Sequence, residues 1–227
     1  MPATDPLSNV DTAAEEISGR IFLLECFTTE CIRTLRREFS KRLAKSAPRF
    51  VVEVALRLLD YHTIEHRFVA YELVCCHRAA LASLNEKDLR LFGCGIGSWG
   101  SVDMFAYYLA GPAWRERQVS DKFIHRWARS GNRWRRRAAL VSTVPLNSKA
   151  RGGTGDTQRT LEVCRLLMSD RDDMVVKAMS WALRELSKRD SGAVKLFLAE
   201  HRQILSARVV REVQNKLSTG LKNPKRS

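Results

Sequence analysis

Apolar residues recur at helical spacing along most of the chain, and this period constrains the fold more than any other feature of the sequence. They stand at i, i+3, i+4 and i+7, as they do in helices that bury one face. The segments with this spacing are 50–61, 68–76, 102–109 and 175–186. The alternation that strands need is almost absent, and proline and glycine fall mainly between the periodic segments. The sequence therefore predicts an all-α protein.

Residue types that favour the N-cap position of a helix stand before three of the periodic segments. Thr63 precedes one periodic segment, Ser101 a second and Asp172 a third, and the side chains of such residues accept hydrogen bonds from the first turn of a helix. The glycine-containing stretch 147–156 is the one clear flexible loop. No lysine follows its glycines as in the Walker motif, so we interpret the stretch as a connector between helices. A contact between this loop and a phosphate is a further possibility.

Alanines mark a second, longer period. One alanine amid basic and aliphatic residues stands in each of four expected helices, and the intervals are 36, 32 and 40 residues. The four are Ala70, Ala106, Ala138 and Ala178. A fifth, alanine-free helix is expected at Val209–Val210. Two-helix repeats have this length and stack into solenoids with an extended concave face. The alternative is that the regular spacing of the alanines is a coincidence among unrelated amphipathic helices.

Positive charge is concentrated in the C-terminal half. The formal net charge is +14, yet residues 1–110 carry 13 basic and 14 acidic side chains, whereas residues 111–227 carry 26 and 11. Basic helices at 133–137, 177–188 and 208–216 recur at the repeat period, so their charges can line one surface. Such a surface attracts nucleic acid, because bound phosphates release condensed counterions. The alternative is that the excess of basic residues only keeps the protein soluble.

The cysteines and the N-terminus indicate a soluble protein. All six cysteines lie in helical, apolar context and none forms a C-x-x-C pair, so we expect reduced core residues. They are Cys26, Cys31, Cys75, Cys76, Cys94 and Cys164. The N-terminus lacks signal-peptide character, and no apolar run approaches the length of a membrane span. We expect a flexible N-terminus (1–11), one repeat domain (12–221) and a basic tail (222–227).

Four segments, each weak alone, stand together in an order that identifies a family. They read EHRFVAYEL (65–73), SWGSVD (98–103), WRRRAAL (134–140) and VVKAMSWALRELSK (175–188). In order, interval, length and basicity they resemble the AlkD-type DNA alkylation repair glycosylases, over most of residues 20–217. The resemblance implies an α-solenoid of HEAT-like two-helix repeats, curved, with a basic concave face that grips double-stranded DNA.

The resemblance also implies a reaction and its residues. Asp103 matches the family's catalytic aspartate, Trp99 and Trp181 its two tryptophans, and Arg137 the arginine before the Ala-Ala pair. The implied activity is monofunctional hydrolysis of the N-glycosidic bond of cationic N3- or N7-alkylated purines, such as 3-methyladenine and 7-methylguanine. Asp103 would stabilise the oxocarbenium ion and position water, while the tryptophans hold the deoxyribose and Arg137 a nearby phosphate.

Other basic residues are expected to contact DNA phosphates as a group, Arg184 alternatively pairing with a carboxylate. They are Arg133, Arg135, Arg136, Lys177, Arg184, Lys188, Arg208 and Arg211. Arg135 and Arg136 are alternatives to Arg137 at the phosphate beside the lesion. No cofactor or metal is implied, and we expect a monomer, located in the cytoplasm with the nucleoid. Trp114, Trp127 and Trp134 are interpreted as core residues.

Three alternatives from other functional classes remain. A non-catalytic DNA-binding repeat protein would need no carboxylate inside a basic cleft, and a protein–protein scaffold would need an acidic partner. His62–His66 reads HTIEH, which matches the H-x-x-E-H pattern of inverted zinc proteases, with Glu65 as the base. No downstream acidic helix offers a third zinc ligand, and the same stretch is accounted for by a helix start.

Overall fold

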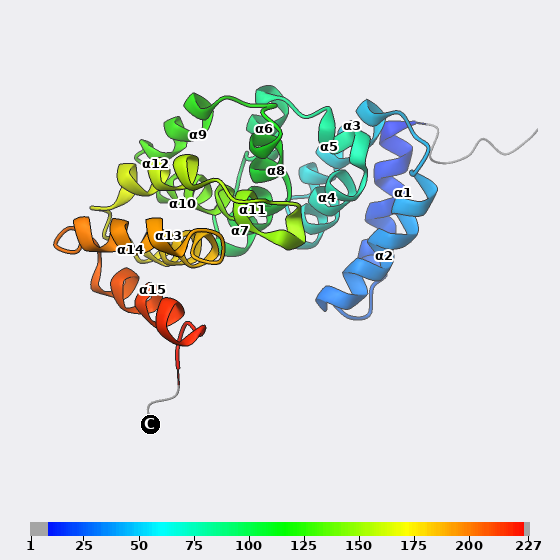
Figure 1. The fold of residues 1–227 in the computed structure, drawn as a ribbon. Helices are drawn as coiled ribbons and strands as arrows, with labels where there is room; N and C mark the ends of the chain where they lie inside the picture. Colours follow the sequence, from blue (N-terminus) through cyan, green and yellow to red (C-terminus); the bar gives the residue numbers. More distant parts are fainter. Residues whose placement is uncertain (1–8, 225–227) are drawn as a thin grey trace, which may run out of the picture. The chain divides into compact units, whose positions relative to one another are not determined.

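The chain folds into helices joined by short turns, as a computed structural model that describes residues 9–224 shows (Figure 1). Within these residues no strand occurs, which confirms the predicted all-α class. Contacts between Cα atoms divide the chain into two compact units, residues 1–96 and 97–227. We name them the N-terminal unit and the C-terminal unit. The single repeat domain expected over 12–221 stays a prediction.

The N-terminal unit is built around helix α4. Its elements are α1 (Val10–Phe22), α2 (Thr29–Arg42), α3 (Pro48–Leu58), the 3₁₀ turn η2 (Leu59–Tyr61), α4 (Ile64–Cys76), α5 (Arg78–Ala82) and α6 (Glu86–Phe92). Helix α4 contacts α1, α2, α3 and α5 and is buried on all sides. One of its buried side chains is Glu72, whose carboxylate accepts hydrogen bonds from Arg33 and Arg36 of α2 at 3.0 and 3.1 Å. Because a buried carboxylate needs cationic partners, these bonds fix α2 on α4.

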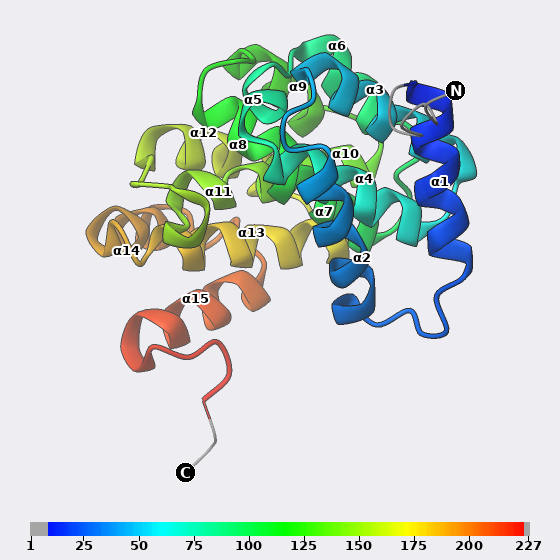
Figure 2. The ribbon, with the colours of Figure 1, turned by 90° about the vertical axis from the view of Figure 1, so that its right-hand side faces the viewer.

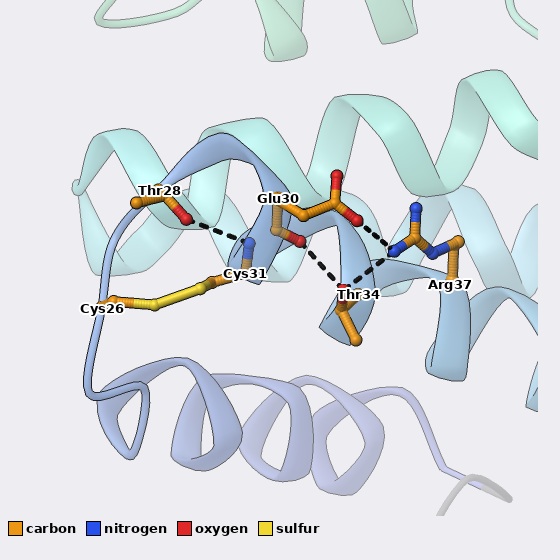
Figure 3. The surroundings of a disulfide bond; sticks show 6 residues. All are labelled: Cys26, Thr28, Glu30, Cys31, Thr34 and Arg37. Carbon is orange, nitrogen blue, oxygen red and sulfur yellow. Dashed lines mark hydrogen bonds and ion pairs between the residues drawn. A yellow bond between two sulfur atoms is a disulfide. The ribbon is translucent and has the colours of Figure 1, made fainter.

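A disulfide joins Cys26 to Cys31, so the expectation that all cysteines are reduced was wrong for this pair. The two residues flank the start of α2, where Thr28 caps the helix by accepting a hydrogen bond from the Cys31 backbone N–H (Figure 3). The turn therefore brings together two cysteines five residues apart. Cys76 and Cys94 are exposed rather than in the core, whereas Cys164 is fully buried, as expected.

Seven helices of the C-terminal unit form two rows. Its elements are α7 (Trp99–Phe105), the π-helical turn η3 (Ala106–Ala110), α8 (Gly111–Arg115), α9 (Asp121–Ala128), α10 (Arg133–Ser142), α11 (Val144–Asn147), the 3₁₀ turn η4 (Lys149–Arg151), α12 (Thr157–Leu167), α13 (Asp173–Leu186), α14 (Ser191–Glu200) and α15 (Ala207–Thr219). In one row α7, α10, α13 and α15 each contact the next, and Figure 2 shows α13 beside α15. The other row holds α9, α12 and α14, which contact α10 and α13. This is the arrangement expected of stacked two-helix repeats.

The alanines of the predicted period are at most 1% exposed. They lie on α4, η3, α10 and α13, where a small side chain lets neighbouring backbones approach closely. Thr63 and Asp172 cap α4 and α13 as predicted. Helix α7 begins earlier than Ser101 predicted: Ser98 is its N-cap, and Ser101 completes a capping box by bonding back to the Ser98 backbone.

The loop 147–156 is held by hydrogen bonds along its length, contrary to the expected flexibility. Arg189 donates to the carbonyls of Asn147 and Gly153, both at 2.8 Å, and Arg115 donates to the carbonyl of Arg151. Gly153 packs so closely that an added Cβ would clash with the Pro145 carbonyl oxygen. The glycines therefore permit close packing here rather than motion.

Residues 1–11 were expected to be flexible and residues 222–227 to form a basic tail. Residues 1–8 and 225–227 lie outside the described residues. Asn9 caps α1, so Val10 and Asp11 form the first turn of a helix rather than part of a flexible segment. The final helix α15 ends at Thr219, followed by Gly220 at φ 74°.

Candidate functional site

The predicted site residues Trp99 and Asp103 lie on one face of α7. Their spacing of four residues places them one turn apart. Tyr107 follows at the same spacing in η3, the π-helical turn that continues α7. The indole of Trp99 is 63% exposed, which is unusual for so large an apolar ring. The helix thus presents an indole, a carboxylate and a phenol in succession.

Asp103 is paired with Arg137 of the neighbouring helix α10. The Nε and Nη2 groups of Arg137 donate to the two carboxylate oxygens of Asp103 at 2.8 and 2.7 Å, a bidentate pair. Nη1 donates to the carbonyl oxygen of Met174, in the first turn of α13, at 2.5 Å. The side chains of Asp103 and Arg137 are only 18% and 7% exposed. One guanidinium therefore ties together α7, α10 and α13.

Burial and the neighbouring Arg137 shift the pKa of the Asp103 carboxyl in opposite directions. Burial raises the pKa of the Asp103 carboxyl above its ordinary value, because the charged form is poorly solvated. The hydrogen bonds and positive charge of Arg137 lower that pKa and offset part of the effect. Burial is the larger of the two effects, so the pKa of Asp103 stays above its ordinary value despite the guanidinium.

Trp181 of α13 stacks on Tyr107. Their ring centroids are 5.9 Å apart, with 27° between the ring planes. The structure thereby connects Trp181 to the face that holds Asp103, through a residue that our sequence reasoning missed. Extending the four-residue spacing of Trp99 and Asp103 by one more turn would have found Tyr107.

The remaining tryptophans only partly fit the core interpretation. Trp114 is fully buried, and its Nε1 donates to Asp121 at 2.7 Å. Trp127 and Trp134 are partly exposed, with Trp127 packed against two phenylalanine rings and Trp134 beneath the guanidinium of Arg133. The core prediction is confirmed for Trp114 alone.

Several of the predicted phosphate-binding residues form ion pairs within the C-terminal unit. Arg136 donates to Asp170 at 2.6 Å and to two backbone carbonyls, so this guanidinium is engaged in holding the turn before α10. Lys177 and Arg208 both pair with the exposed Asp173. The Lys177–Asp173 pair lies within α13, whereas the Arg208–Asp173 pair joins α15 to α13, its neighbour in the same row.

The other predicted phosphate contacts are less engaged. Arg135 and Arg211 are exposed, Lys188 pairs with Glu185, and Arg133 lies 3.7 Å from Asp172. Arg184 is half-buried and donates to the Ser180 hydroxyl at 3.2 Å. Burial lowers the pKa of the Arg184 guanidinium. A phosphate contact for each of these eight residues stays a prediction.

His66 of the HTIEH pattern lies in the core of the N-terminal unit. It is fully buried, and its two ring nitrogens are hydrogen-bonded to the hydroxyls of Ser18 and Thr63 at 2.9 and 2.7 Å. These contacts account for the histidine without a metal. No group of three or more His, Cys, Asp or Glu residues suited to a metal ion occurs in residues 9–224. In the same part of the chain, no helix has the length and apolar character to cross a membrane.

Comparison with protein families gives a match over most of the chain. A family model described as DNA alkylation repair enzyme matches residues 27–217, which include Trp99, Asp103, Arg137 and Trp181. The predicted family resemblance is confirmed. No curated protein sequence matches the chain.

Proposed function

Because the chain belongs to the DNA alkylation repair enzyme family, we propose that it is a monofunctional DNA glycosylase that removes cationic alkylated purines from duplex DNA. The observation that carries the proposal is the Asp103 carboxylate, largely buried within a strongly basic unit and fixed by two hydrogen bonds from Arg137. DNA binding alone gives no reason for an oriented carboxylate at such a place.

The chemistry follows from the charge of the substrate. Alkylation at N3 or N7 makes a purine cationic, so its glycosidic bond breaks without protonation of the departing base. Positive charge then develops on the deoxyribose, as in the oxocarbenium ion of glycoside hydrolysis. Asp103 stabilises that charge by electrostatic attraction and accepts a hydrogen bond from the attacking water.

The two tryptophans act on the same cation. Trp99, at 63% exposure, presents its ring to solvent, and Trp181 is fixed by its stacking on Tyr107. Aromatic faces attract cations by about 0.5–2 kcal/mol, so both rings favour the charged deoxyribose over a neutral one. Neutral bases leave too slowly without a general acid, which restricts the reaction to charged lesions. The products are the free alkylated base and an abasic site.

Arg137 has a positioning role in this proposal. Its three hydrogen bonds to Asp103 and Met174 use three of the five N–H groups that a guanidinium carries, which leaves two, on a side chain that is only 7% exposed, for the expected phosphate contact. The main role of Arg137 is therefore to orient the Asp103 carboxylate, and a contact with the DNA backbone is a secondary role. Arg135, exposed on the same helix, is the better candidate for an independent phosphate contact.

The test is base release from a duplex that carries one 7-methylguanine, with the wild type compared with Asp103→Asn. We expect release by the wild type, and a loss well beyond tenfold in the variant, with unchanged affinity for DNA. The amide keeps the shape of the side chain and removes its charge. Tight, salt-sensitive binding without release by either protein would instead favour a non-catalytic DNA-binding protein.

A further inference from the structure

Arg151, in the turn η4, lies over the two tyrosines that follow Asp103 on the continuation of α7. Its guanidinium carbon is 4.5 Å from the ring centroid of Tyr107 and 4.3 Å from that of Tyr108. Tyr107 in turn stacks on Trp181. An arginine from the loop 147–156 thus stands one aromatic ring away from a predicted site residue, although none of the sequence motifs includes it.

The loop presents this arginine on a rigid support. Its backbone is held by Arg115, which donates to the carbonyl of Arg151 itself, and by Arg189, which donates to the carbonyls of Asn147 and Gly153. Gly152 turns the chain at φ 75°, directly after η4. A side chain on such a support loses little conformational freedom when it binds a ligand.

The charges around the loop favour an anion. Lys149 and Arg189 are exposed, and Arg115 is 23% exposed. Together with Arg151 they are four basic residues; the carboxylates nearby in the sequence are Glu116, paired with Arg115, and Asp156, paired with a further arginine, Arg159. A cluster with this excess of positive charge attracts a phosphate group.

The stacking and a phosphate contact are geometrically compatible. A guanidinium meets an aromatic ring through its flat face, while its N–H groups lie in its plane and bind phosphate through the edge. The rings of Tyr107 and Tyr108 are inclined at 80°, so the guanidinium can lie parallel to only one of them, and the two rings together restrict its orientation. A lysine could supply the charge at this place but not the planar stack.

We propose that Arg151, packed against the rings of Tyr107 and Tyr108, binds a backbone phosphate of the DNA strand beside the Asp103 site. Tyr107 is then a positioning residue that supports Arg151 on one side and Trp181 on the other. The inference rests on the proposed function for the identity of the ligand, duplex DNA, but not on catalysis.

The test measures the affinity of an undamaged duplex as a function of salt for the wild type, Arg151→Gln and a matched control, Arg165→Gln. Arg165 is an exposed arginine of α12, in the other row of helices. We expect Arg151→Gln to weaken binding about tenfold. Its plot of log affinity against log salt should be shallower by roughly 0.9, the contribution of one phosphate. Arg165→Gln should keep the wild-type slope.

Two tyrosine variants separate positioning from folding. Tyr107→Phe keeps the ring, so it should retain the wild-type salt slope, whereas Tyr107→Leu should lose as much slope as Arg151→Gln. Thermal unfolding of each variant identifies those that fail to fold. An Arg151→Gln variant that folds and keeps the wild-type slope would overturn the proposal, as would equal losses in Arg151→Gln and Arg165→Gln.

Undamaged DNA makes the outcome independent of the glycosylase reaction. If the wild type binds with the expected slope but releases no 7-methylguanine, the proposed function fails while the role of Arg151 stands. If 7-methylguanine is released and Arg151→Gln binds as the wild type does, only the role of Arg151 fails.

Discussion

Replacing Arg137 by methionine removes the cation from a carboxylate that is largely shielded from water. Loss of one partner from a buried ion pair costs about 3–5 kcal/mol, mostly because the remaining charge is left uncompensated. Asp103 keeps 18% of its side chain exposed, so water can solvate it partly and the lower end of the range applies. We expect the free energy of unfolding of the C-terminal unit to fall by about 3 kcal/mol. For a domain of this size the midpoint of thermal unfolding should drop by roughly 6–12 °C.

Intrinsic fluorescence is suited to this measurement, because all five tryptophans lie between residues 97 and 227. Urea unfolding followed by tryptophan emission therefore reports on the C-terminal unit. Arg135→Met is the matched control, since Arg135 is an exposed arginine of the same helix, and it should change the stability by less than about 0.5 kcal/mol.

A double variant, Arg137→Met with Asp103→Leu, tests whether the uncompensated charge of Asp103 causes the loss of stability. Removing both charges should recover most of the loss, since a well-packed apolar pair is often as stable as a buried ion pair. The reasoning is refuted if Arg137→Met costs less than about 1 kcal/mol, or if the double variant is less stable than Arg137→Met alone.

Two further predictions concern pH and the disulfide. Base release, corrected for uncatalysed loss, should fall as the pH drops through the pKa of Asp103, which burial raises above that of an ordinary aspartate. In Arg137→Gln the fall should begin at higher pH, because the lowering effect of the guanidinium is lost; coincident profiles would contradict this. Reducing Cys26–Cys31 should destabilise the N-terminal unit by about 2 kcal/mol, the chain-entropy value for so short a loop, as urea unfolding by circular dichroism would show. Alkylation of the denatured, unreduced protein should label four cysteines, and six would refute the bond.

The helices could be predicted well from the sequence, because a helix depends on the spacing of apolar residues within one segment of the chain. The periodic segments became α3 with η2, α4, α7 with η3, and α13, and the alanine period marked buried positions. The candidate site was also accessible from sequence, since Asp103 and Trp181 belong to recognisable motifs. The family match over residues 27–217 agrees with that resemblance.

Contacts between segments could not be predicted in the same way. Arg137 was expected at a phosphate, yet it is paired with Asp103, 34 residues earlier in the chain. Arg136 was a candidate for the same phosphate, and its guanidinium pairs with Asp170, 34 residues later in the chain. Which carboxylate faces an arginine depends on how the helices pack, and helical spacing carries no information about it. The glycine-rich loop was misjudged for the same reason, because distant arginines hold it.

The π-helical turn Ala106–Ala110 has a consequence for relatives of this protein. A π turn is a helical turn widened by one residue, and it stands between the carboxylate of Asp103 and the tightly packed Gly111, where an added Cβ would lie 2.7 Å from a backbone oxygen. A relative with a regular helix here should therefore show a one-residue deletion between these two landmarks. The extra residue shifts the register of the residues after the turn relative to Asp103, so the length of this short interval would tell which relatives share the spacing between Asp103 and Gly111 seen here.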